Sequence, residues 1–237
     1  MDDAAPGTER PDQMRTRKRV IGIIGGVAVA IAAVVVVLVA AGGGDSGTSK
    51  RASTAPVTVL RGDKISLPLG DVSADSAGPA VTVSPELSQQ VLTVVGNYVK
   101  GATVEPLRSG APSKANLGTV FDARTLAQAT GIDRGIVLDE GLPKVTGTLD
   151  VLAQPIALVG LGDQGGNLSL VTAAVVLDVN GQTAVKTSPL HIVRRADFVL
   201  APDGTGAWKV TAYNMVVTRA GGGLDPTTTT TTVGAVK

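Results

Sequence analysis

Arg194 is the side chain whose type and position in this sequence most clearly suggest chemistry. It lies in the run LHIVRRADFVL, residues 190–200, in which apolar and polar residues alternate. Successive side chains of a strand point to opposite faces, so Arg194 is expected on the apolar face. A buried guanidinium needs a carboxylate, and we expect Asp178 or Asp150 to supply it. The alternatives are an anion-binding cavity, a structural ion pair, or a bulge that turns Arg194 to solvent.

Two tyrosines complete the set of candidate ligand-binding residues, which is Arg194, Asp178, Tyr98 and Tyr213. Polar groups that converge in an otherwise apolar pocket are typical of small-molecule sites. If the chain binds or transforms a small apolar or lipid-like molecule, these four side chains should surround one concavity. The other interpretation of Tyr98 is a core residue whose hydroxyl finds a hydrogen-bond partner.

Other residue types that carry chemistry are scarce in this chain. His191 is the only histidine and no cysteine is present, which excludes a histidine metal cluster, a zinc-thiolate site and a cysteine nucleophile. No Gly-x-Ser-x-Gly turn occurs, and Gly160-Leu161-Gly162 is followed by Asp163 without a phosphate-binding lysine. We therefore assign no catalytic residue, no metal ligand and no cofactor.

Two further polar pairs are expected at the surface. His191 and Asp197 fall on the polar side of the run 190–200, where they would form an exposed pair. Asp139-Glu140 precedes Gly141-Leu142-Pro143, and we expect these two acidic residues in a solvated loop or at a helix end.

The charge balance argues against a polyanionic partner. The chain has 21 Lys or Arg residues, 20 Asp or Glu residues and a formal net charge of +1. Beyond residue 41 the chain has 16 basic and 16 acidic residues, so this part carries no excess of positive charge that would favour nucleic acid.

The elements that must position these residues change in type along the chain. Ser84-Pro85 begins a stripe of apolar residues at steps of three and four, which predicts a helix over 85–100 that ends at Gly101. A weaker apolar stripe predicts a second helix over 117–129, and 132–138 favours a short helical turn. Before these helices, residues 57–83 read as one or two short strands in an extended lead-in.

From Lys144 onward the apolar period becomes two, which is typical of strands. We expect a strand over 145–153 that Pro155 ends or bulges, and a long strand over 168–179 followed by a hairpin turn at Asn180-Gly181. Two more strands are expected at 190–200 and 208–218. In the last one, Trp208, Val210, Ala212 and Val216 should face one way, and Lys209, Thr211 and Tyr213 the other.

Helices followed by a meander of long antiparallel strands indicate an α+β domain with helices packed on one face of a curved sheet. This order over residues 84–220 resembles the NTF2-like (cone) fold. The run Pro202–Val210, PDGTGAWKV, resembles the Gly-rich turn and Trp-basic-Val strand of that superfamily. Together with a membrane helix, it is similar to single-pass accessory proteins of actinobacterial cell envelopes, including those associated with Mce-type lipid importers. The resemblance implies a cone with a hollow mouth.

An uncharged apolar run at residues 20–41, VIGIIGGVAVAIAAVVVVLVAA, predicts a transmembrane helix. Arg15, Arg17, Lys18 and Arg19 directly precede it, so residues 1–19 are expected in the cytoplasm and the rest of the chain outside. The alternative is a signal peptide cleaved after Val39-Ala40-Ala41, although its apolar region would be unusually long.

The sequence thus predicts five segments. They are a basic cytoplasmic N-terminus (1–19), a transmembrane helix (20–41), a flexible linker (42–56), an extracytoplasmic domain (57–221) and a disordered Thr-rich tail (222–237). Such a chain, held at the cell membrane by its contact with the lipid bilayer, is expected to be a non-catalytic accessory or assembly module of the cell envelope. The apolar strand 168–179 predicts homo- or hetero-oligomer contacts through the sheet. The alternative function is a cavity domain for a small apolar or lipid-like molecule.

Overall fold

The computed structural model of this chain describes residues 55–61, 64–113 and 115–224. These residues belong to one of the chain's two units, Arg51–Val236, whereas Met1–Lys50 and Lys237 form the other. The predicted membrane helix (20–41), the N-terminus (1–19), nearly all of the linker and the tail from residue 225 lie outside the described residues. Of the helices in the described ranges, none combines the length and apolar character needed to cross a membrane.

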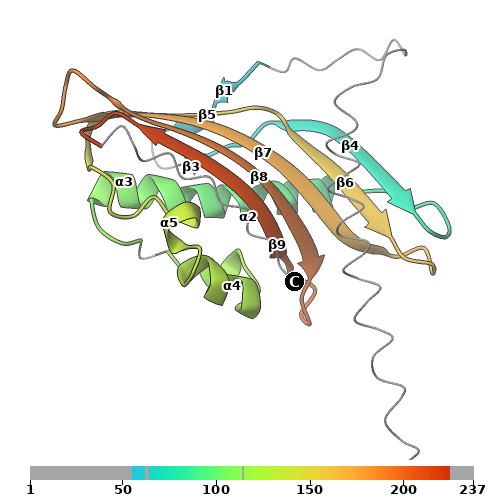
Figure 1. The fold of residues 1–237 in the computed structure, drawn as a ribbon. Coiled ribbons are helices and arrows are strands. Elements are labelled where there is room, and N and C mark those ends of the chain that lie inside the picture. The colour runs from blue at the N-terminus through green and yellow to red at the C-terminus, as the bar shows by residue number, and fades with distance from the viewer. Residues whose placement is uncertain (1–54, 62–63, 114, 225–237) are drawn as a thin grey trace, which may run out of the picture. The chain divides into compact units, whose positions relative to one another are not determined.

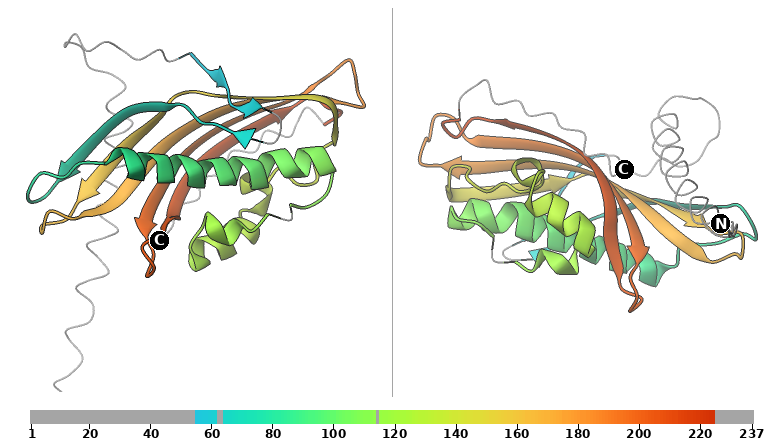
Figure 2. Two further views of the ribbon diagram at one scale, coloured as in Figure 1. Left: turned by 180° about the vertical axis from the view of Figure 1, so that it is seen from behind. Right: turned by 60° about the horizontal axis from the view of Figure 1, so that its bottom comes forward.

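A curved, mostly antiparallel sheet arches over one long helix and several short ones (Figure 1). The α+β class predicted from the sequence is therefore confirmed. The two further views show the helices gathered on the concave side of the sheet (Figure 2). We call this concave side the inner face and the opposite side the outer face.

The long helix α2 (Pro85–Val99) lies where the sequence predicts it. The hydroxyl of Ser84 accepts a hydrogen bond from the Leu87 amide at 3.2 Å, which caps the helix start. Gly101 does not end the helical path, because a π-turn, η1 (Lys100–Val104), leads directly into α3 (Glu105–Ser109). The chain leaves the helical region at Gly110, whose φ of 69° suits a glycine C-cap.

The predicted helix 117–129 is interrupted in the structure. A short turn, η2 (Leu117–Thr119), is followed by α4 (Ala123–Thr130) and then by α5 (Arg134–Val137). The break arises because the backbone at Val120 and Asp122 bonds to Val210 of the last strand. The Asp122 carboxylate then caps α4 by accepting from the Thr125 amide at 2.7 Å.

Four short strands make up the lead-in, more than the one or two expected. They are β1 (Val57–Thr58), β2 (Leu60–Arg61), β3 (Lys64–Ile65) and β4 (Leu69–Ser76). β2 and β3 pair only with each other, β1 pairs with β5, and β4 pairs in parallel with β6.

The strand predicted at 145–153 is confirmed as β5 (Val145–Ala153), and Pro155 separates it from β6 (Ile156–Gly162). The sequence analysis did not recognise β6. Both strands pair with the same edge of β7 (Leu168–Thr183), β5 with its C-terminal half and β6 with its N-terminal half. Proline has no amide hydrogen to donate to a ladder, so it falls at the break.

The hairpin turn predicted at Asn180-Gly181 is wrong. β7 continues to Thr183, and Asn180 and Gly181 pair with β8 (Leu190–Pro202) on one side and with β5 on the other. The two-residue turn signal is overridden because strands on both edges hold this backbone extended. The chain reverses instead after Thr183, where Ser188 donates to the Val185 carbonyl.

The last strand, β9 (Trp208–Ala220), contains a bulge that reverses the predicted faces. Val199 pairs with Ala212 but Leu200 pairs with Val210, which leaves Thr211 as an extra residue. Beyond the bulge, Tyr213, Met215 and Val217 are buried on the inner face. The expectation that Ala212 and Val216 share a face with Trp208 is therefore wrong.

The inner face and α2 enclose the core. The largest fully buried side chains in the described residues are Arg194, Tyr98, Phe121, Phe198, Leu107, Ile156, Leu158, Leu177, Leu190, Ile192, Leu200 and Met215. The rings of Tyr98 and Phe198 meet edge to face with centroids 5.0 Å apart. Within this apolar list Arg194 is the one charged side chain, on the apolar face of its strand as predicted.

The N-cap of α2 can be tested directly by replacing Ser84. Ser84→Ala removes the capping oxygen and should lower the free energy of unfolding by about 1 kcal/mol in urea titration of the full-length chain. Ser84→Asp keeps an acceptor and adds a charge that suits the helix start, so it should match the wild type. Equal losses in both variants would contradict the capping role.

Candidate functional site

The partner of Arg194 is Asp139, which was expected in a solvated loop or at a helix end. Asp139 follows α5 and is 1% exposed, as is Arg194 on β8. The Nη2 of Arg194 donates to Oδ2 of Asp139 at 2.8 Å. The predicted ion pair of Arg194 with Asp178 or Asp150 is therefore wrong. Asp139 does lie at a helix end, directly after α5, but it is buried and not solvated.

Asp139 uses its full hydrogen-bonding capacity in this cluster. Oδ2 accepts from Arg194 and, at 2.7 Å, from the hydroxyl of Thr103 in the π-turn η1. Oδ1 accepts twice from Arg219 near the end of β9, from Nε at 3.0 Å and from Nη2 at 2.7 Å. A carboxylate has about four acceptor positions. Asp139 thus has no oxygen lone pair left for a ligand or a transferred proton.

The Arg219 guanidinium also closes the end of α5. Its Nη1 donates to the Gly135 carbonyl at 2.8 Å, and its Nη2 lies 3.4 Å and 3.3 Å from the carbonyl oxygens of Ile136 and Leu138. The last carbonyls of a helix have no partner within the helix and carry a partial negative charge. Arg194 and Arg219 share the single negative charge of Asp139. The carbonyl oxygens of α5 therefore offset the positive charge that remains.

Arg194 also contacts Tyr98 and Thr103. Its Cζ lies 5.6 Å from the Tyr98 ring centroid, and its Nη1 donates to the Thr103 hydroxyl at 2.6 Å. Burial lowers the pKa of Arg194, but the Asp139 charge, the electrostatic effect of Tyr98 and the hydrogen bond to Asp139 together outweigh burial and leave the pKa above its usual value. The Nε of Arg194 is buried without a hydrogen-bond partner. We name the set Arg194, Asp139, Arg219 and Thr103 the arginine clamp.

Both tyrosines of the candidate set are core residues with occupied hydroxyls. The Tyr98 hydroxyl donates to the Val137 carbonyl at 2.9 Å, and burial raises the pKa of Tyr98 to about 12. The Tyr213 hydroxyl donates to the Asp133 carboxylate at 2.8 Å. Burial, with this hydrogen bond, raises the pKa of Tyr213 well above its usual value. Phe121 lies between the two rings, with centroids 6.0 Å and 6.1 Å away.

Asp178 lies on the outer face, away from the other three candidates. Its neighbour on β7, Leu177, pairs with Arg194 and is buried, whereas Asp178 pairs with Val193. Its carboxylate contacts the His191 Nε2 at 3.0 Å and accepts from the Asn180 amide at 2.8 Å. The expected surface pair of His191 with Asp197 is therefore replaced by a half-exposed pair of His191 with Asp178.

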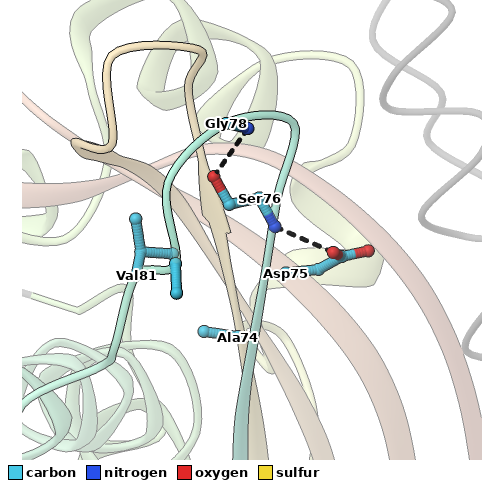
Figure 3. A pocket seen from close by; sticks show the side chains of 6 residues that line it. Ala74, Asp75, Ser76, Gly78 and Val81 are labelled. Carbon is cyan, nitrogen blue, oxygen red and sulfur yellow. Dashed lines mark hydrogen bonds between the residues drawn. The ribbon is translucent and has the colours of Figure 1, made fainter.

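A shallow hollow of about 270 Å³ lies at the far end of β4, outside the clamp (Figure 3). Its lining side chains are short, and in Figure 3 the Asp75 carboxylate points away from Val81. That carboxylate accepts from the Ser76 amide at 2.8 Å, and the Ser76 hydroxyl accepts from the Gly78 amide at 3.1 Å. Its polar groups thus serve the local turn. Across residues 55–61, 64–113 and 115–224, no three His, Cys, Asp or Glu side chains are grouped to hold a metal ion.

Some polar groups on the outer face are also left without partners. Its central rows come from β7, β8 and β9, and most of their side chains are half-buried. Asp197 has its pKa raised by burial, and the Asn214 Oδ1 beside it is buried without a hydrogen-bond donor. We define the outer patch as Ala174, Val176, Val193, Arg195, Asp197, Asn214 and Val216.

No local pattern in the sequence links Asp139, Arg219 and Thr103 to Arg194. Strict alternation from Trp208 puts Arg219 on the face opposite Trp208 and Val210, and only the bulge at Thr211 brings it inward. Asp139 is 55 residues from Arg194, and Thr103 is 91 residues from it, so no local spacing links them. The sequence did predict that a buried Arg194 pairs with a carboxylate. It did not show which aspartate supplies that carboxylate.

Comparisons with known protein families, with curated proteins and with solved structures gave no match for this chain. Its class is therefore given by the fold itself, an α+β domain with a curved, antiparallel-rich sheet. The likeness to the NTF2-like superfamily stays a prediction.

The arginine clamp predicts that Asp139→Asn lowers the free energy of unfolding much more than Asp178→Asn does. Asp139→Asn keeps the shape but leaves two buried guanidinium groups without a carboxylate, and should cost about 3–5 kcal/mol in urea unfolding. Asp178→Asn, the matched control on the outer face, breaks a half-exposed pair and should cost less than about 1 kcal/mol. A loss at Asp139 no larger than that at Asp178 would show that the clamp does not support the fold.

The tyrosines predict a pH dependence, since the chain has only two of them. Both have raised pKa values in the folded state, so at about pH 11 the folded chain should show little tyrosinate absorbance, whereas the urea-unfolded chain titrates near about pH 10. Folding favours the neutral phenols, so their contribution is complete below the unfolded pKa and is lost as pH rises through the folded value, about 12 for Tyr98. If half of the tyrosinate absorbance of the folded chain appeared near about pH 10, one tyrosine would have an ordinary pKa and the prediction would be wrong.

Proposed function

We propose that this chain is a membrane-anchored, non-catalytic accessory or assembly module of the cell envelope, with its folded domain on the outer side of the cytoplasmic membrane. The observation that carries the proposal is the saturation of the Asp139 carboxylate in the arginine clamp. Its two oxygens already accept from Arg194, Thr103 and Arg219. The unpartnered acceptors at Asp197 and Asn214 lie instead on the outer face. An exposed apolar face with polar groups is suited to protein contacts.

The sequence supports the location. Residues 20–41 carry no charged side chain and follow a basic cluster, a pattern typical of an anchor with its N-terminus in the cytoplasm. The linker 42–56 is rich in Gly, Ser, Thr and Ala and would hold the domain near the bilayer. Confinement near the membrane raises the effective concentration toward membrane-bound partners.

The order of elements favours an NTF2-like domain as the carrier of this function. Helix α2 and the shorter helices precede the long antiparallel strands β7, β8 and β9, and the sheet curves over α2. In this proposal the mouth of the cone is filled by the rings of Tyr98, Phe121 and Phe198. The domain therefore acts through the surface of its sheet.

Photocrosslinking in intact cells tests the proposal. A photoreactive amino acid at Val193 on the outer face should capture membrane proteins of the envelope. The same probe at Ile132, which is 93% exposed on the helical side, is the matched control and should capture few. All crosslinked chains should stay in the membrane fraction after an alkaline wash. Equal capture at both positions contradicts the interaction surface, and a mature chain free in the medium that starts near Gly42 contradicts the anchor.

A further inference from the structure

Exposed charges of opposite sign gather at the two ends of the sheet. At one end β5 begins, β7 ends and β8 begins, because Val145 pairs with Thr183 and Gly181 pairs with Leu190. The hairpins β6–β7 and β8–β9 lie at the other end of β7. We call the first the basic end and the second the acidic end, for the charges that they carry.

Three cationic side chains are exposed at the basic end. Lys186 lies in the turn between β7 and β8, Lys144 directly precedes β5, and Arg108 lies near the end of α3, at the same end in Figure 1. The Nη1 of Arg108 donates to the Gly147 carbonyl at 2.8 Å, which holds this guanidinium beside β5. In the described part of the chain, none of the three forms an ion pair. Their charge is therefore free to attract an anion from outside the domain.

The acidic residues near the basic end have partners of their own. Glu140 pairs with Arg134, and Glu105 accepts from the Ser113 hydroxyl at 3.0 Å. Both glutamates are partly buried. Lys100, exposed on the helical segment that leads into α3, adds a further positive charge. The basic end thus presents a net positive surface.

The opposite end carries the reverse charge. Asp163 and Asp203 lie in the loops of the two hairpins, and Asp75, near the end of β4, is opposite Leu161. Asp203 pairs with Lys209 at 3.3 Å, whereas Asp75 and Asp163 form no ion pair among the described residues. The 16 residues of β7 separate the two ends by about 50 Å along the strand. The charges of the domain therefore form a dipole along the sheet.

We propose that the basic end binds the anionic headgroups of the lipid bilayer, so that the acidic end points away from the membrane. The inference rests on the proposed function, because an anchored domain stays within reach of the bilayer surface. The linker 42–56 is rich in Gly and Ser, and a flexible chain of that length spans roughly 20 Å on average. The bilayer surface is therefore the anion that the domain meets at the highest effective concentration.

The composition of the basic end favours a lipid surface over an acidic protein. Its cations belong to separate elements, and such spread charge suits a diffuse negative potential, to which each cation contributes on the order of fivefold in binding. Val185, beside Lys186 in the same turn, is an apolar side chain that is 41% exposed. An apolar side chain next to cations is typical of segments that lie at the membrane interface.

The orientation agrees with the use of the outer patch for protein contacts. A sheet that stands on its basic end turns its outer face sideways, parallel to the bilayer. Neighbours anchored in the same membrane then reach this face without displacing the lipid contact.

Two fluorescent probes compare the distances of the two ends from the lipid. The chain has no cysteine, so single labels can be attached at Thr187→Cys in the turn beside Lys186 and at Gly204→Cys in the β8–β9 hairpin. A Cβ at Gly204 meets no other atom within 4 Å. Each full-length variant is reconstituted into vesicles of phosphatidylcholine and phosphatidylglycerol that contain a headgroup-labelled acceptor lipid. Energy transfer should be at least about twofold stronger from position 187 than from position 204.

Charge dependence identifies the cause of this difference. Transfer from the two positions should become equal in phosphatidylcholine alone, and also in about 1 M salt, which screens surface charge. Lys144→Gln combined with Lys186→Gln should also remove the difference. Gln90→Glu combined with Gln164→Glu is the matched control, because it changes the net charge by the same amount away from the basic end, and it should leave the difference intact.

Equal transfer from both positions in the mixed vesicles, or a difference that the two lysine replacements leave unchanged, overturns the proposal. Since these vesicles hold no other protein, an acidic protein partner cannot produce the expected result. The outcomes are separate from those of the proposed function, which are membrane retention and capture of envelope proteins from Val193. A chain that is retained and captures such proteins, but whose two ends lie equally far from the lipid, rejects only the orientation.

Discussion

The carboxylate of Asp139 holds together three parts of the chain that are far apart in the sequence. It receives Arg194 from β8, Arg219 from β9 and Thr103 from the helical turn η1, all in a nearly water-free interior. Neither arginine tolerates burial without this negative charge, and the charge tolerates burial only because four donors surround it. These ion pairs and hydrogen bonds, together with apolar packing, thus fix the position of the helical layer relative to the sheet.

The same arrangement determines where the molecule can interact. The Asp139 carboxylate contributes to stability, and with four donors around it no acceptor position is left for a ligand. The orphan Nε of Arg194 shows that the cluster was formed at some cost, which the surrounding apolar contacts offset. The outer face differs, because Asp197 and Asn214 there have acceptors without donors although neither is fully exposed. In the proposed function, this incomplete set of hydrogen bonds on an accessible face belongs to the surface that a partner would cover.

Local patterns in the sequence predicted the elements whose stabilisation is local. The capped start of α2, the short turn of α5, strand β5 with its break at Pro155, and the inward face of β8 all follow from caps and periodicity. The predictions failed where distant strands decided the outcome. Strands on both edges keep Asn180 and Gly181 extended, and the bulge at Thr211 reverses the faces of β9. One extra residue in a strand moves every later side chain to the opposite face of the sheet. The alternation of apolar and polar residues in the sequence does not reveal where such a residue lies.

The sequence by itself determined the class of the domain, the inward position of Arg194 and the requirement for a buried carboxylate. These follow from residue types and periodicity, which act over a few neighbouring positions. The tertiary structure alone decided that Asp139 meets this requirement, that Arg219 joins it, and that Asp178 belongs to the outer face. Each of these depends on contacts between residues 13 to 91 positions apart in the sequence, and only the folded backbone brings them together.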